Sequence, residues 1–172
     1  MCTDYKKLQN GSDIRGVAME VPGGLPVNLN GETAKALTIG FGLEVSERAG
    51  LPAENLSIAI GRDSRITGED LLKVAAKTLS EMGFTVLDCG LSSTPAMFMS
   101  TIFPEFGADG AIMITASHLP PDRNGFKYFF EGKGADKEDI SKIISRAEAM
   151  GKCDENKAKT LEKGTGARGG IK

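Results

Sequence analysis

Apolar positions along this chain recur at two spacings, which predict strands alternating with helices. Short apolar segments bounded by glycine, proline or polar residues are typical of strands, and they lie at 14–18, 56–60, 84–87, 111–114 and 126–130. Apolar residues three or four positions apart are typical of one helix face, and they occupy 30–49, 69–82 and the segment that begins at Asp136. Thr94-Pro95 has the residue types of a helix start and predicts a further helix.

Residues that commonly cap helices stand at the ends of these segments. Asn30 fits the start of the first helix, and Gly50 with Pro52 just beyond it fits the end. Gly83 fits the end of the second helix. The positions expected to face inward are Ala34, Leu37, Phe41 and Val45 in the first helix, Leu71, Ala75, Leu79 and Met82 in the second, and Ile140, Ile143, Ile144 and Ala147 in the last.

This alternation predicts an α/β fold, a three-layer α/β/α sandwich. The connection between 111–114 and 126–130 is short, so these two strands should form an antiparallel hairpin. We therefore expect a mixed, mostly parallel sheet of about four main strands. Residues 1–150 are expected to form one domain. Residues 151–172 are rich in lysine and glycine and are expected to be a flexible tail or a linker stub.

Composition narrows the class of protein. Hydrophobic residues make up 40% of the chain and charged residues 26%, which is ordinary for a globular domain. A net charge of -2 argues against a nucleic-acid partner, and no apolar run is long enough to indicate a membrane partner. The N-terminus lacks the apolar segment of a secretory signal, and Cys2, Cys89 and Cys153 are too scattered for a zinc site, so a cytoplasmic protein with reduced thiols is expected.

The candidate chemistry concentrates in residues 115–127, Thr-Ala-Ser-His-Leu-Pro-Pro-Asp-Arg-Asn-Gly-Phe-Lys. His118 is the only histidine, and it directly follows Ser117. The preceding apolar strand would bring both residues out at the carboxyl end of the sheet, where α/β proteins place their sites. Asn124-Gly125 is expected to form a tight reversal, after which Lys127 lies in extended structure. One segment thus presents a hydroxyl, an imidazole and an ammonium.

This segment resembles the active-site serine loop of the α-D-phosphohexomutases, the phosphoglucomutase and phosphomannomutase superfamily. The usual family form is Thr-Ala-Ser-His-Asn-Pro followed by Asn-Gly-x-Lys, and Leu119 stands here in place of the asparagine. Gly11-Ser-Asp-Ile-Arg-Gly16 is similar to the N-terminal signature that brings an arginine, here Arg15, into the site. Gly61-Arg-Asp-Ser-Arg65 is similar to the Gly-Arg-Asp-x-Arg turn of the first domain. The three matches follow the family order and span residues 11–130.

The resemblance implies a role for each matching residue. Ser117 would carry a phosphoryl group, His118 and Lys127 would be catalytic with it, and Arg15 and Asn124 would bind substrate or phosphate. A magnesium ion would bind Ser117 through its phosphate, with aspartate ligands that are absent from this chain. A hexose bisphosphate would serve as activator and intermediate.

The family's metal loop, sugar-selecting loop and second phosphate loop belong to later domains, and none of them is found in these residues. The resemblance therefore implies the phosphoserine-bearing first domain of a mutase that interconverts hexose 1-phosphate and hexose 6-phosphate, incomplete on its own. Its partners would be a phosphosugar substrate and the remaining mutase domains, in cis or in trans. Glucose, mannose and glucosamine phosphates all stay open as the substrate.

Other interpretations of these residues stay open as well. Arg62, Asp63 and Arg65 are expected to form an ion-pair and turn network, and Arg123 to be solvated. A Ser-His-Asp hydrolase is disfavoured because adjacent residues on an extended chain point to opposite sides. The alternative to a mutase domain is a stand-alone, non-catalytic module that binds a phosphosugar or another protein. Gly164-Thr-Gly-Ala-Arg-Gly169 fits a dinucleotide-binding pattern but lacks the strand and helix that give the pattern its mechanism.

Overall fold

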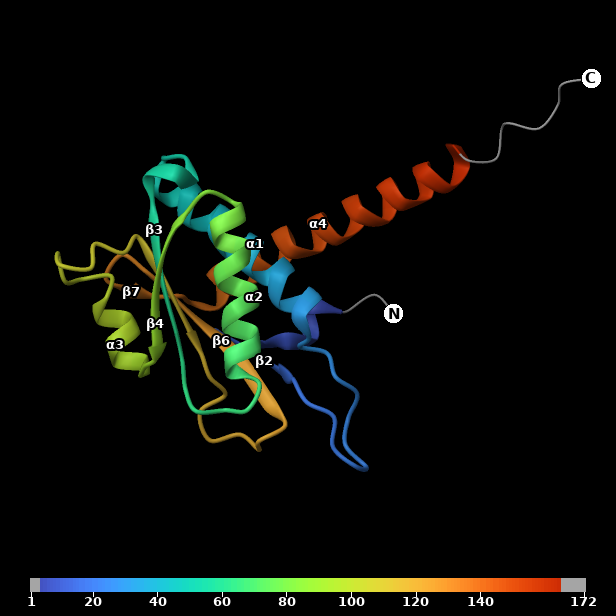
Figure 1. Ribbon diagram of the computed structural model, residues 1–172, viewed down its shortest axis with the longest axis horizontal. Coiled ribbons are helices and arrows are strands. Elements are labelled where there is room, and N and C mark those ends of the chain that lie inside the picture. The colour runs from blue at the N-terminus through green and yellow to red at the C-terminus, as the bar shows by residue number, and fades with distance from the viewer. Residues whose placement is uncertain (1–3, 165–172) are drawn as a thin grey trace, which may run out of the picture.

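The computed structural model describes the backbone of residues 4–164 and the side chains of residues 4–150, arranged around one mixed sheet (Figure 1). In these residues the sheet has seven strands in the order β1-β2-β6-β5-β3-β4, with β7 paired to β6. Their bounds are Gln9–Asn10 for β1, Asp13–Val17 for β2, Ser57–Arg62 for β3, Thr85–Leu91 for β4, Gly110–Ile114 for β5, Arg123–Phe130 for β6 and Lys133–Gly134 for β7. The helices are α1, Gly31–Ala49; α2, Gly68–Glu81; α3, Thr94–Met99; and α4, Lys137–Gly164. Short 3-10 turns cover Tyr5–Leu8 and Ala53–Asn55.

Strand directions confirm the mixed sheet. The central strand β3 pairs in parallel with both β4 and β5, whereas β6 is antiparallel to β5 and to β2. Strands β2, β3, β4 and β5 therefore run in one direction, and β6 runs against them. The predicted hairpin of the two strands around the serine segment is the β5–β6 pair. Consequently β6 lies between the segment that precedes the serine and the N-terminal strand β2.

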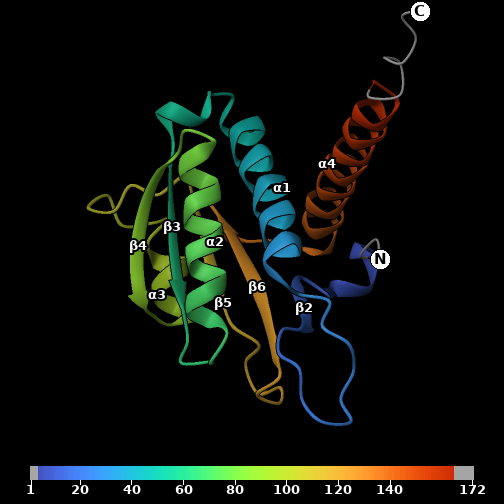
Figure 2. The same ribbon diagram turned by 45° about the vertical axis from the view of Figure 1, so that its right-hand side comes forward.

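The strands bury alternate side chains on two faces, which makes three layers. One face, including Ile58, Ile60 and Ile112, packs against α1, α2 and α4 in the larger core cluster. The other face, including Ala111 and Met113, packs against α3 in a smaller cluster. In Figure 2, α2 lies in front of the strands and α3 behind them. The three-layer prediction is thus confirmed, with one outer layer formed by a helix of only six residues.

Local capping chemistry fixes the helix ends. Asn30 accepts a hydrogen bond from the backbone N–H of Thr33 at 2.9 Å, and Gly50 ends α1 in the left-handed region at a φ of 63°. Asp136 caps α4 by accepting from two backbone N–H groups, each at 3.0 Å. The predicted cap at Thr94 is wrong by one residue, because the side chain of Ser93 accepts the capping bond of α3.

Two expectations need correction or extension. Asn124-Gly125 is not a turn, because both residues lie inside β6 and the chain reverses earlier, where the Arg123 N–H binds the Pro120 carbonyl at 3.0 Å. Helix α4 continues past position 150 to Gly164. The expected boundary between a domain and a tail at position 150 stays a prediction. Cys89 is a free, half-buried thiol, whereas Cys2, the side chain of Cys153 and the glycine-rich pattern at 164–169 lie wholly or partly outside the described residues.

Candidate active site

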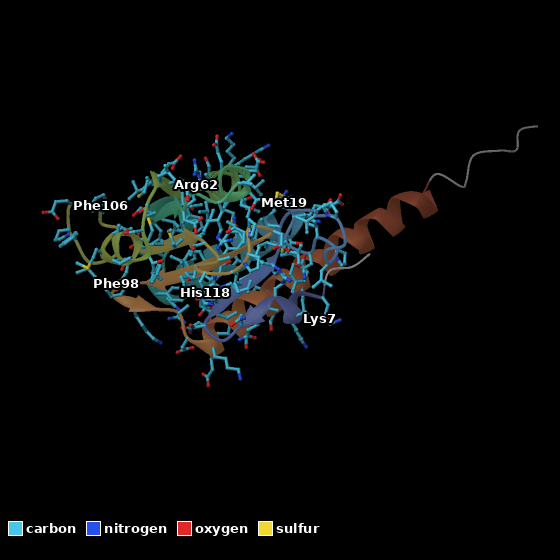
Figure 3. The ribbon with its side chains drawn as sticks, turned by 90° about the horizontal axis from the view of Figure 1, so that it is seen from below. Lys7, Met19, Arg62, Phe98, Phe106 and His118 are labelled. Atoms are coloured by element: carbon cyan, nitrogen blue, oxygen red, sulfur yellow. The ribbon has the colours of Figure 1, made fainter. Side chains whose placement is uncertain are left out.

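The candidate site lies where β2, β6 and β5 are neighbours. The register pairs Arg15 of β2 with Gly125 of β6, and the Thr115 N–H just after β5 binds the Gly125 carbonyl at 3.0 Å. The N-terminal strand β2 and the distant β5–β6 hairpin therefore meet just past the carboxyl end of β5, opposite the middle of β2. Figure 3 views the molecule from this end, with His118 and Arg62 labelled. Residues 115–123 are called the serine loop from here on.

Ser117 is held in an uncommon backbone conformation. Its φ is 53°, and among residues 4–164 it is the one residue other than glycine with a positive φ. Such a conformation is unfavourable for a side chain with a Cβ, so surrounding contacts must maintain it. The Ser117 N–H donates to Thr115 Oγ1 at 2.9 Å, and that hydroxyl donates to Asp63 Oδ2 at 2.6 Å. The side chain of Ser117 itself is exposed and available to a ligand.

A single guanidinium organises the rest of the serine loop. Arg65 Nη2 donates to the carbonyls of Ser117 at 2.7 Å and Leu119 at 2.8 Å. Its Nη1 donates to the carbonyls of Pro120 at 2.8 Å and Arg123 at 3.0 Å. Arg65 also forms an ion pair with Asp63 at 3.4 Å. The expected ion-pair and turn network therefore exists, and it supports the backbone that carries the serine.

Arg15 reaches the serine by crossing β6 at a glycine. Its Nη1 lies 3.3 Å from the Thr115 carbonyl oxygen, and its Nη2 lies 3.3 Å from Ser117 Oγ. A Cβ atom at Gly125 would lie 3.0 Å from Arg15 Cδ and would overlap the Ile14 carbonyl oxygen. Gly125 is therefore needed for close approach of a neighbouring strand and side chain, rather than for a turn.

Lys127 lies beside Arg15, and a carboxylate joins the two. Oδ2 of Asp13 accepts from Lys127 Nζ at 2.6 Å and from Arg15 Nη2 at 2.8 Å. The side chains of Asp13, Arg15 and Lys127 are 16%, 13% and 23% exposed. We call Arg15 and Lys127 the cation pair. Asp13 was not among the residues predicted from the sequence, although its position two residues before Arg15 on a strand places both on the same face.

The remaining predicted residues divide into two groups. His118 is exposed, follows the serine directly, and has no hydrogen bond within the described part of the chain. Asn124 is fully buried; it donates to Thr67 Oγ1 at 2.9 Å and accepts from the Gly125 N–H at 2.9 Å. The structure therefore does not bring the Asn124 side chain to Ser117. Its contacts instead join β6 to the start of α2.

Two outlying arginines act locally. Arg62 donates to the Asp63 carbonyl at 3.1 Å and lies 3.5 Å from Glu69. Arg123, expected to be solvated, pairs with Asp122 at 3.3 Å and is one-third exposed.

A magnesium site is not complete among the described residues. They contain no group of three or more histidine, cysteine, aspartate or glutamate side chains that could hold a metal ion. Two carboxylates that contact the site residues are already engaged, Asp13 by the cation pair and Asp63 by Thr115 and Arg65. The described residues thus do not form a complete metal site on their own. In the same described residues, no helix is both long and apolar enough to cross a membrane.

The described residues form an α/β/α domain in which an exposed serine lies beside an arginine, and a carboxylate joins that arginine to a lysine. Residues 6–152 match the family described as phosphoglucomutase/phosphomannomutase, alpha/beta/alpha domain I. The match covers most of the 172 residues, so the chain belongs to this family and corresponds to its first domain.

Individual relatives agree with this assignment. A phosphomannomutase/phosphoglucomutase of Pseudomonas aeruginosa is 35% identical over 136 residues, which cover 79% of this chain and 26% of that protein. A phosphoglucosamine mutase of a Synechococcus species is 39% identical over 124 residues, 70% of this chain and 25% of the relative. The crystal structure of a phosphoglucomutase/phosphomannomutase family protein from Burkholderia thailandensis superposes with a TM-score of 0.67 at 28% identity, covering 81% of this chain and 29% of that one. The chain thus spans about a quarter of the length of these curated relatives.

Proposed function

We propose that this chain is the phosphoserine-bearing first domain of a mutase that interconverts hexose 1-phosphate and hexose 6-phosphate through a bisphosphate intermediate. The observation that carries the proposal is the exposed Ser117 hydroxyl, 3.3 Å from Arg15 Nη2, on a loop held in a strained conformation. Membership of the family and the mutase names of its relatives support the reaction class.

The cation pair suits a phosphorylated serine. A phosphoserine carries close to two negative charges near neutral pH, and a guanidinium can bind two phosphate oxygens at once. Arg15 already faces Ser117 Oγ, and Lys127 adds a second positive charge held beside it by Asp13. Phosphoryl transfer depends mainly on positioning and on cations that face the phosphoryl oxygens. These two side chains provide both for one end of the reaction.

The chemical step is an exchange of one phosphorus–oxygen bond for another. A hydroxyl oxygen of the hexose phosphate attacks the phosphorus, and the bond from phosphorus to Ser117 Oγ breaks. The attacking hydroxyl loses its proton, and the serine oxygen gains one as it becomes a hydroxyl again. In the return step Ser117 Oγ attacks the other phosphate of the bisphosphate, with the proton moving the opposite way. Because His118 directly follows the serine and is exposed, we expect it to take part in these proton transfers.

Part of the proposed machinery must come from outside this chain. A magnesium ion would supply charge neutralisation when bound to the complete enzyme, and a phosphate on Ser117 would be one of its ligands. We expect the contacts that select the sugar to lie in the three-quarters of the relatives' length that this chain does not match. We therefore expect the remaining domains as partners, a phosphosugar as substrate and a hexose bisphosphate as activator. The 172-residue chain alone should show no steady-state turnover.

A chimera tests this proposal. Residues 6–152 would replace the matching domain of the Pseudomonas aeruginosa relative, and the relative's own domain put back by the same procedure would be the positive control. After incubation with glucose 1,6-bisphosphate, intact-mass and peptide spectra should show one phosphoryl group on Ser117, and the chimera should turn over glucose 1-phosphate. Ser117→Ala should abolish the phosphoryl group and turnover together.

The matched control is Ser64→Ala, since Ser64 is exposed and close by in sequence to Arg65 but touches none of the proposed groups. It should keep both phosphorylation and turnover. Turnover that survives Ser117→Ala, or a folded chimera with phosphate on another serine, would contradict the proposal. Turnover by the isolated 172-residue chain would contradict its incompleteness.

A further inference from the structure

Asp13 is a charged residue at the site for which the proposed reaction has no role. One of its oxygens, Oδ2, binds both members of the cation pair, at 2.6 Å from Lys127 Nζ and 2.8 Å from Arg15 Nη2. The carboxylate is 16% exposed, so water screens these contacts only in part. Its position is fixed by the sheet, because Asp13 and Arg15 share one face of β2 and the register pairs Ile14 with Phe126, which places Asp13 next to Lys127.

The same arginine nitrogen serves the carboxylate and the serine. Arg15 Nη2 lies 2.8 Å from Asp13 Oδ2 and 3.3 Å from Ser117 Oγ. A phosphoryl group on Ser117 would place roughly two negative charges close to this nitrogen. Asp13 and the phosphoryl group would then share the same two positive charges. Three negative charges facing two positive ones hold a phosphoryl group less firmly than two facing two.

We propose that Asp13 sets how firmly the cation pair holds a phosphoryl group on Ser117. While the serine is free, the carboxylate keeps Arg15 and Lys127 in place. Once the serine is phosphorylated, the carboxylate offsets part of their charge, so the phosphoryl group is not bound too tightly to leave. A mutase needs this balance because its serine must give the group away as readily as it takes it. Asp13 is therefore a positioning and charge-balancing residue, and this inference rests on the function proposed above.

A thermodynamic cycle on the 172-residue chain tests the inference. Phosphoserine is installed at position 117 during translation, and the unfolding free energy is measured by urea denaturation with and without the phosphate. The cycle compares the wild type with Asp13→Asn, which keeps the shape and removes the charge. Phosphorylation should raise the folding equilibrium constant about tenfold more in Asp13→Asn than in the wild type, a value typical of one partly screened charge at close range. The difference should shrink as salt is added.

Asp122→Asn is the matched control, because the one ion pair of Asp122 among the described residues is with Arg123, at 3.3 Å, within the serine loop. Phosphorylation should raise the folding equilibrium constant of this variant by the same factor as in the wild type, to within about twofold. If Asp13→Asn does not fold, Asp13→Ser keeps an oxygen acceptor without charge and should show the same tenfold difference. Equal stabilisation of the wild type and the uncharged variant, or weaker stabilisation of the variant, would overturn the inference.

The cycle and the chimera test separate claims. Because the phosphoserine is installed during synthesis, the cycle does not depend on phosphoryl transfer from a sugar. Absence of phosphate on Ser117 in the chimera would refute the proposed function and leave the cycle unchanged. A cycle without coupling would refute the role of Asp13 and leave the chimera result unchanged.

Discussion

Replacement of Arg65 by lysine keeps the positive charge and removes the geometry that gathers the serine loop. The guanidinium donates from two nitrogens to four backbone carbonyls at 2.7–3.0 Å, and its side chain is 12% exposed. A lysine ammonium donates from a single nitrogen, and it cannot span four carbonyls that were spaced for a planar fork. At least two of these bonds should therefore be lost.

The expected cost follows from the energy of such bonds. A hydrogen bond from a charged donor stabilises a protein by about 1.5–3 kcal/mol, and water can replace part of this at a loop surface. We expect Arg65→Lys to lower the free energy of unfolding by about 2–4 kcal/mol. Urea denaturation followed by circular dichroism at 25 °C measures this change, provided that the slope with denaturant stays constant.

Arg62→Lys is the control for this experiment. Arg62 makes one carbonyl bond at 3.1 Å and a longer ion pair with Glu69, whose side chain is 56% exposed. Its replacement should lower the free energy of unfolding by less than about 1 kcal/mol. If the two lysine variants lose equal stability, or if Arg65→Lys matches the wild type within error, Arg65 does not hold the loop in the way described.

Two further changes test other parts of the fold. Gly125→Ala should lower the free energy of unfolding by about 1–3 kcal/mol, because the new methyl group overlaps the Ile14 carbonyl and crowds Arg15. Gly31→Ala is the control, since the nearest atom to its new methyl group would be 3.7 Å away. The melting temperature of this control should stay within a few degrees of the wild-type value. At Asp136, hydrogen bonds from the backbone N–H of Asp139 and from Lys133 lower the pKa from 3.8 to about 2. A depressed pKa means that the carboxylate stabilises the fold above pH 3.8 and that this contribution is lost as the pH falls through 2. The stability difference between the wild type and Asp136→Asn should therefore shrink over that range, and a carboxyl NMR titration with a midpoint near 4 would contradict this account.

The elements with strong periodicity were predictable because their determinants are local. Asn30 and Gly50 mark the ends of α1 by capping chemistry that involves neighbouring residues only. The hairpin of β5 and β6 followed from the short segment between two apolar runs. The strand β5, which precedes the serine loop, was also predictable from the sequence, because it is a continuous apolar run that the sheet buries completely.

What the sequence could not show depends on neighbours across the sheet. Asn124-Gly125 is a common turn pair, and local reasoning predicts a turn there. The decisive fact is that Arg15 lies opposite Gly125, which requires a strand position without a side chain. Asp13 was missed for the same reason, because nothing local to it shows that Lys127 will lie 2.6 Å away. Arg65 was expected to belong to a turn network, but the four carbonyls it binds come from residues more than fifty positions later.

The place of β2 beside β6 has a consequence for how the chain folds. Arg15 and Ser117 are 102 residues apart in sequence, and Asp13 and Lys127 are 114 apart. During synthesis β2 leaves the ribosome long before its partner strand exists, and contacts between distant residues form slowly because a long loop must close first. We therefore expect β3, β4 and β5 to associate with α1 and α2 before β6 emerges, and the cation pair to assemble last.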